Sequence, residues 1–189
     1  MSLFEGIEGV WGSDDVAAPD DLAVHLMAYD NNTGESHPAT RREILDAAAE
    51  IMLRHVSAEP LRDITAVFDY LKLHIGTREE EHFGMLMLNL HHELIDVHDI
   101  HTGTVDQAVV HSREVMKAVL VDHNATGVIL FHNHPSGNLQ PSGADVQMTQ
   151  RIVDPLHPIG VTVFDHIIVT SADCTSLRKL GRRCFQPKR

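Results

Sequence analysis

The chain has 189 residues and 43% hydrophobic side chains, enough for one well-packed domain with some additional length. A formal net charge of −12 argues against a general affinity for nucleic acid. No apolar run approaches the roughly 18 residues that a membrane span needs, and no signal pattern opens the chain. The two cysteines form no C-x-x-C pair, so we expect a reduced, cytoplasmic protein without a cysteine-based zinc site.

The N-terminal part is predicted to differ from the rest of the chain. Residues 1–39 contain no lysine or arginine, and we expect an acidic, loosely ordered lead with a short helix around Leu22–Tyr29. Residues 40–63 are expected to form a helical lead. Within it "ATRREILDAAAEIMLRHV" predicts a helix that Thr40 can cap. Its apolar stripe is expected to be Ile44, Ala48, Ile51 and Leu53.

A second helix and a hairpin are predicted next. "DITAVFDYLKLHI" has a stripe at helical spacing, and Gly76 is a fitting end for that helix. The stripe consists of Ile64, Val67, Phe68, Leu71 and Ile75. The runs "HFGMLMLNL" and "ELIDVHDIH" then predict two strands of a hairpin.

Helices and strands alternate from there to the C-terminal part. "SREVMKAVLVDH" predicts an amphipathic helix whose apolar side is Val115, Ala118 and Val119, with Ala125 nearby. "GVILF" predicts a buried strand, "GADVQMTQRIVDPL" a helix that begins at Ser142, and "VTVFDHIIVT" another strand. The predicted fold class is therefore α/β or α+β with a mixed sheet flanked by helices.

The stretch "VILFHNHPSGNLQPSGAD" contains a candidate metal centre. His132 and His134 directly follow the buried strand, and residues two apart in extended chain point to the same side. Asp145 lies in the first turn of the next helix, from which its carboxylate can return to the strand end. Two imidazoles and one carboxylate suit Zn²⁺ and leave a fourth position open for water, as in catalytic sites.

These residue types also allow a purely structural interpretation. Ser142 and Asp145 fit a helix N-cap, and the two histidines could be ordinary polar residues at a strand end. Both interpretations of Ser142 are compatible, because a hydroxyl that accepts a capping bond can still donate to an oxyanion.

A catalytic metal centre also needs a general base. Glu79, Glu80 and Glu81 stand at the entry to the first hairpin strand, and their spacing alone does not choose among them.

The sequence resembles the JAMM metalloproteases of the MPN/JAB superfamily, and its RadC branch most of all. The resemblance is carried by "HNHPSGNLQPSGAD", with its H-x-H-P and S-x-x-D signature, and by flanking segments from about Ile64 to Val169. It implies a cytidine-deaminase-like core with a curved sheet and a zinc ion held by His132, His134 and Asp145. It also implies that Ser142 is the signature serine. Because "EHFGMLML" matches the family pattern that follows the catalytic glutamate, it further implies that Glu81 is the base.

The resemblance also bears on the domain organisation. RadC-type proteins usually carry a helix-hairpin-helix module, but residues 40–76 contain no G-x-G turn, so the lead of residues 40–63 looks like a degraded remnant. The expected RadC-like domain spans residues 64–175, and residues 176–189 form a basic tail. That tail leaves contact with nucleic acid weakly supported.

The leading functional prediction is a zinc-dependent hydrolase that cleaves a peptide or isopeptide bond in a peptide or protein substrate. Two alternatives are a non-catalytic MPN interaction module and a RadC-type DNA-repair accessory. Asp165 and His166 could orient a ligand imidazole or form a buried pair. The substrate and the oligomeric state are left open.

Overall fold

The computed structural model describes residues 26–30, 33–57, 60–61, 64–102 and 112–187. The chain divides into two compact units, residues 1–40 and 41–189. In the described part of the first unit, β1 (Met27–Tyr29) pairs antiparallel with β2 (Ser36–Pro38). The helix predicted around Leu22–Tyr29 is therefore wrong over Met27–Tyr29, and its earlier residues lie outside the described ones. The strand forms because the backbone turns back at Gly34, whose φ of 76° suits glycine.

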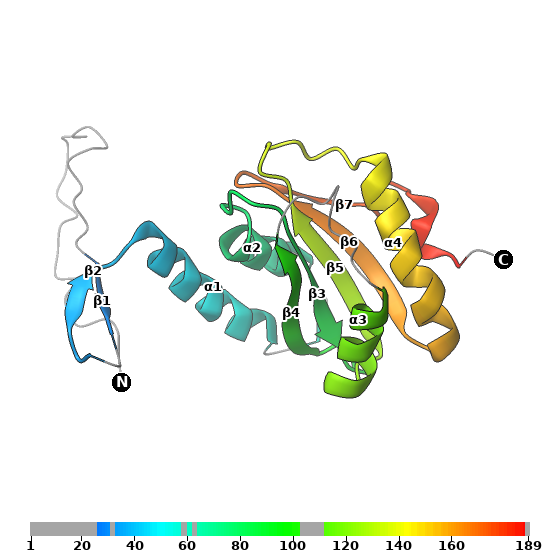
Figure 1. Ribbon diagram of the computed structural model, residues 1–189, viewed down its shortest axis with the longest axis horizontal. Helices are drawn as coiled ribbons and strands as arrows, with labels where there is room; N and C mark the ends of the chain where they lie inside the picture. Colours follow the sequence, from blue (N-terminus) through cyan, green and yellow to red (C-terminus); the bar gives the residue numbers. More distant parts are fainter. Residues whose placement is uncertain (1–25, 31–32, 58–59, 62–63, 103–111, 188–189) are drawn as a thin grey trace. The chain divides into compact units, whose positions relative to one another are not determined.

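A mixed sheet forms the centre of the second unit (Figure 1). Among the described residues it has five strands in the order β4 (Leu94–Thr102), β3 (His82–Leu88), β5 (Gly127–Asn133), β6 (Thr162–Val169) and β7 (Cys174–Ser176). Only β5 and β6 are parallel, and all other neighbours are antiparallel. The predicted hairpin, the buried strand and the mixed α/β fold class are confirmed.

Helices cover both faces of this sheet (Figure 1). On one side lie α1 (Arg41–Ser57) and α2 (Ile64–His74). On the other lie α3 (Ser112–Lys117), its π-helical continuation η2 (Ala118–Asp122) and α4 (Gly143–Leu156). Short 3-10 turns at His157–Ile159 (η3) and Arg183–Phe185 (η4) follow. No helix among the described residues combines the length and the hydropathy that a membrane crossing requires.

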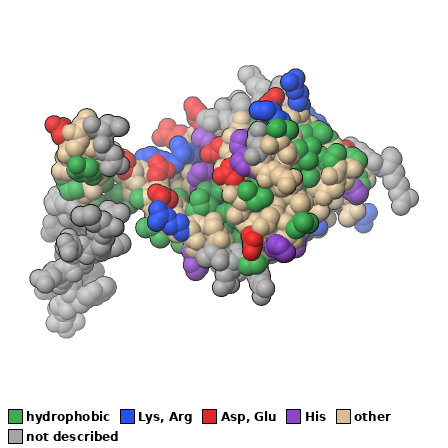
Figure 2. Space-filling view, turned by 90° about the horizontal axis from the view of Figure 1, so that it is seen from below, with side chains coloured by type: hydrophobic (Ala, Val, Ile, Leu, Met, Phe, Trp, Pro, Cys, Tyr) green, Lys and Arg blue, Asp and Glu red, His purple; other side chains and the backbone are tan. Residues whose placement is uncertain are grey.

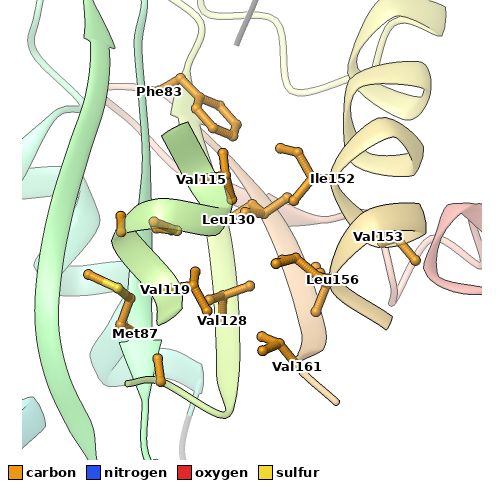
Figure 3. Close-up of a cluster of buried hydrophobic side chains, with 14 of the residues drawn as sticks. Phe83, Met87, Val115, Val119, Val128, Leu130, Ile152, Val153, Leu156 and Val161 are labelled. Atoms are coloured by element: carbon orange, nitrogen blue, oxygen red, sulfur yellow. The ribbon is translucent and has the colours of Figure 1, made fainter. Parts of the chain in front are cut away.

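Strand alternation divides the core into two clusters. Met85 and Met87 of β3 face α3 and α4, whereas Leu86 and Leu88 face α1 and α2. Figure 3 shows the first cluster, in which side chains of β3 and β5 meet those of α3 and α4, with Phe83 at one end. Strand β5 is buried on both faces, which explains why "GVILF" is apolar at every position.

Most predicted helices are confirmed, with one wrong face. Val67, Leu71 and Ile75 are buried as predicted, and so are Val115, Ala118, Val119 and Ala125. In α1, however, Ile44 and Ile51 are 37% and 60% exposed. Leu53 packs inward as predicted, but the residues that share its face are Ala49, Met52 and Val56, which have the same helical spacing. Both stripes fit a helix, and only the position of α1 against α2 and β4 decides between them.

Candidate metal centre

The end of strand β5 brings two imidazoles together. His132 is fully buried and the His134 side chain is 13% exposed, and their Nε2 atoms lie 2.8 Å apart. The strand keeps an extended backbone through Asn133, so both histidines project to the same side. Pro135 and Gly137 then turn the chain away, and Gly137 adopts a φ of 77°.

Helix α4 returns a carboxylate to the same point. Ser142 caps the helix: its Oγ accepts from the Asp145 backbone N–H at 3.1 Å, and its own N–H donates to Asp145 Oδ2 at 2.6 Å. This capping box fixes the carboxylate and leaves Oδ1 at 3.2 Å from His132 Nε2. Oδ2 lies 3.7 Å from His134 Nε2. The same two hydrogen bonds therefore cap the helix and orient the carboxylate.

The three side chains have the spacing of a metal-binding set. One ligand atom from each of His132, His134 and Asp145 lies within 4.8 Å of the other two. Ligand atoms about 2.0–2.2 Å from a tetrahedral zinc ion lie about 3.3–3.5 Å from one another. The observed separations of 2.8, 3.2 and 3.7 Å bracket that value. The donor set therefore fits zinc without rearrangement of the backbone.

Hydrogen bonds on the outer side of each ring determine which nitrogen carries the proton. His134 Nδ1 lies 2.6 Å from the Asn138 carbonyl, which can only accept, so Nδ1 carries a hydrogen. On the other ring, His132 Nδ1 lies 2.8 Å from His166 Nε2. One of these two nitrogens must donate, and the partners of His166 decide which.

The deciding partner is Thr149, which is fully buried on α4. Its hydroxyl donates to the Asp145 carbonyl at 2.7 Å, so its oxygen accepts from His166 Nδ1 at 2.6 Å. A neutral His166 then has a bare Nε2 that accepts from His132 Nδ1. The Nε2 lone pairs of His132 and His134 consequently face each other and the Asp145 carboxylate. Such a concentration of lone pairs requires a positive charge, either a proton or a metal ion.

The electrostatics of His166 agree with this assignment. Burial lowers the pKa of His166 well below its usual value, and the neighbouring His132 lowers it further, so His166 is neutral at pH 7. Burial alone would raise the pKa of Asp145. Interactions with His132 and the hydrogen bonds from Ser142 outweigh burial and hold that pKa well below its usual range. Asp145 is therefore a buried anion.

Asn133, between the two histidines, points to a different partner. Its side chain is fully buried: Oδ1 accepts from the His82 N–H at 2.6 Å, and Nδ2 donates to the carbonyls of Glu80 at 3.1 Å and Arg78 at 3.2 Å. These bonds hold the backbone on both sides of Glu81. The register pairs Phe83 with His132, so the chain just before β3 runs beside His134.

The structure thus brings together His132, His134, Asp145 and Ser142. Glu81 is half-buried and stands immediately before β3, the strand that pairs with β5 as expected. Of the "DH" pair, His166 contacts His132, whereas Asp165 accepts from Ser176 and from the Arg178 backbone. Thr149 and Asn133 were not found from sequence. The only available signal was their polarity at positions where strand and helix periodicity predict burial.

Comparisons with known proteins match the part of the chain that contains this centre. A family model described as "RadC-like JAB domain" matches residues 61–182. A UPF0758 protein of Vibrio cholerae is 44% identical over 140 residues, covering 74% of this chain and 88% of its own length. One of Ralstonia nicotianae is 34% identical over 180 residues, covering 86% and 80%. One of Paracidovorax citrulli is 40% identical over 149 residues, and the chain spans 62% of its length. The match contains every residue of the centre described above, and the chain belongs to the RadC-like JAB domain family.

Proposed function

We propose that this chain is a zinc-dependent hydrolase that cleaves a peptide or isopeptide amide bond. The observation that carries the proposal is the set of hydrogen bonds around the two imidazoles, from which their protonated nitrogens are inferred. Both imidazoles present a bare Nε2 to one point, next to a carboxylate oxygen that the helix cap leaves unused. Three protein ligands leave one position for water, which is the arrangement of catalytic rather than structural zinc sites.

When bound, zinc would supply Lewis-acid chemistry, lowering the pKa of water to about 7 and polarising the amide carbonyl. His132, His134 and Asp145 would hold the ion through the atoms that already converge. Thr149 and His166 would keep the His132 proton on Nδ1, away from the ion. Burial of Asp145 and His132 would exclude bulk water from the inner side of the centre.

Glu81 is the proposed general base. Its backbone lies between two groups that Asn133 holds, at the end of β3 nearest the histidines. Phe83, two residues on, packs edge-on against His166, so an extended chain would direct Glu81 to the same face. There the carboxylate would take the proton of the attacking water and pass it to the leaving amine.

Ser142 is the proposed oxyanion donor. Its Oγ accepts a hydrogen bond from the Asp145 N–H, and its own hydroxyl hydrogen has no assigned acceptor in that cap. Because Ser142 is exposed and adjacent in space to Asp145, the hydroxyl can donate to a carbonyl oxygen at the mouth of the centre. Removing one oxyanion donor typically lowers kcat by about 10²–10³.

The first test is zinc content by elemental analysis of the wild type and of His134→Ala, with His91→Ala as the matched control. His91 is an exposed histidine in the β3–β4 turn. We expect the His134→Ala chain to contain one zinc ion fewer than the wild type and than His91→Ala. Equal contents in the wild type and His134→Ala would refute the zinc centre.

The second test separates binding from catalysis. Glu81→Gln should retain the zinc of the wild type but lose cleavage of a peptide library, and Glu79→Gln should retain both. Cleavage by Glu81→Gln at the wild-type rate would remove Glu81 from the mechanism. A wild type that holds zinc and cleaves neither peptides nor isopeptide-linked substrates would remove the hydrolase proposal.

A further inference from the structure

A second group of metal-ligand residues lies at the edge of the sheet, on residues that the centre above does not use. Asp96 and His98 stand two apart on β4 and therefore share a face. Their partners in the register are Met87 and Met85, which belong to the core cluster beneath α3 and η2. Asp96 and His98 thus face the side on which η2 lies.

His123 reaches this edge from the end of the π-helical turn η2. Its backbone N–H donates to the Ala118 carbonyl at 3.1 Å, the wide i→i+5 bond that ends the turn. The next residues are also anchored, because the N–H groups of Ala125 and Thr126 donate to Val119 at 2.8 Å and to Leu88 at 2.9 Å. Single π-turns of this kind are rare and often occur at functional sites.

The three side chains offer ligand atoms to one another rather than to other groups. His123 Nε2 lies 3.5 Å from Asp96 Oδ2, and the rings of His98 and His123 are 5.9 Å apart in an edge-on arrangement. One ligand atom of each residue lies within 4.8 Å of the others. Among the described residues, no hydrogen bond uses a ring nitrogen of His98 or His123.

We propose that Asp96, His98 and His123 form a second site for a divalent transition-metal ion of the zinc class. Two imidazoles and one carboxylate suit such ions better than Mg²⁺ or Ca²⁺, which prefer oxygen ligands. All three side chains are partly exposed, so water can complete the coordination and the ion can exchange with solvent. An ion there joins edge strand β4 to the end of η2, and so stabilises the sheet edge increasingly as the concentration of free metal rises.

The site closes with small side-chain movements. Asp96 and His123 already have nearly the separation of about 3.3–3.5 Å expected around zinc. The ligand atom of His98 already lies within 4.8 Å of the other two and must move closer to them. The two proposed sites share no residue, and β3 separates β4 from β5 in the sheet. Occupation of one can therefore be measured without the other.

The experiment is a Zn²⁺ titration by calorimetry in the His134→Ala background, where the first centre is disabled. We expect one ion per chain, which disappears in His134→Ala/His98→Ala and persists in His134→Ala/His91→Ala. The His91 control is needed because histidines lie at several separate places on the molecular surface (Figure 2). Zn²⁺ should also raise the Tm of the His134→Ala chain and leave that of His134→Ala/His98→Ala unchanged.

The outcomes are distinct. If the His134→Ala chain binds no zinc, or if His98→Ala leaves its binding unchanged, the second site does not exist. If the wild type binds one ion that His98→Ala removes and His134→Ala does not, the second site stands and the zinc hydrolase proposal fails. Should His98→Ala fail to fold by circular dichroism, His123→Gln in the same background gives the same test.

Discussion

The Thr149 hydroxyl is the group that fixes the proton of His132, so Thr149→Val tests the proposed centre without touching a ligand. Valine keeps the volume of this fully buried side chain but leaves the His166 Nδ1–H without its acceptor at 2.6 Å. An unpaired buried donor costs about 1–3 kcal/mol. The variant avoids that cost if His166 moves its proton to Nε2 and donates to His132.

That rearrangement places the His132 proton on Nε2, the nitrogen that faces Asp145 at 3.2 Å. Zinc binding must then restore the original tautomer and pay about 1–3 kcal/mol, which corresponds to an affinity about 5- to 150-fold lower. Loss of an outer partner of a metal-binding histidine typically has an effect of this size, about 10–100-fold. Thr149→Ser keeps a hydroxyl and should retain most of the affinity.

Two measurements check this prediction. Competition with a chromogenic chelator gives the zinc affinity of Thr149→Val, of Thr149→Ser and of Thr175→Val, a control on β7. Nitrogen-15 NMR of the imidazoles, recorded on zinc-free protein, shows which nitrogen of His166 is protonated. An affinity of Thr149→Val within twofold of the wild type, or a wild-type His166 protonated at Nε2, would refute the reasoning.

Three other substitutions test the packing and the loop beside the centre. Gly84→Ala should destabilise the fold by about 3 kcal/mol in urea unfolding. The added Cβ would lie 2.8 Å from a backbone carbonyl oxygen and closer still to the ring of the phenylalanine opposite on β5. Gly143→Ala is the control, because its Cβ would meet no atom within 4 Å. Burial raises the pKa of Cys174 to about 12, so the native state keeps a proton that the unfolded state loses. The Cys174 thiol should therefore contribute a fall in stability of about 2 kcal/mol from pH 9 to 10.5, and the fall measured in Cys174→Ala unfolding curves should be smaller by that amount. Asn133→Ala should speed amide exchange around Glu81 and lower kcat more than zinc affinity; unchanged exchange would contradict the bracing role.

Local patterns were sufficient to predict the parts of the centre that lie close together in sequence. His132 and His134 share a face because strand alternation is a short-range property. Ser142 and Asp145 are related by the capping box, which acts across a single helical turn. Their convergence on one point needed only the assumption that the intervening loop turns the chain back.

The partners outside the ligand set depend on long-range pairing and could not be predicted in the same way. Thr149 meets His166 because β6 pairs with β5 in a particular parallel register and α4 packs beside them. A one-residue slip would turn His166 away from His132. The buried face of α1 was wrong for a similar reason, since helical periodicity permits two stripes and tertiary packing selects one.

The tripeptide at the end of β5 links the proposed metal ligands to the proposed general base through strand alternation. Its middle residue, Asn133, is directed away from the two histidines and forms hydrogen bonds with the backbone of the segment that carries Glu81. One strand end therefore sets both the metal-ligand geometry and the position of the proposed base, and neither can shift without the other. An amide is required in the middle, because that position must accept from one backbone N–H and donate to two carbonyls. Aspartate has the same shape but offers no donor when ionised, so we expect Asn133→Asp to be as disruptive as alanine.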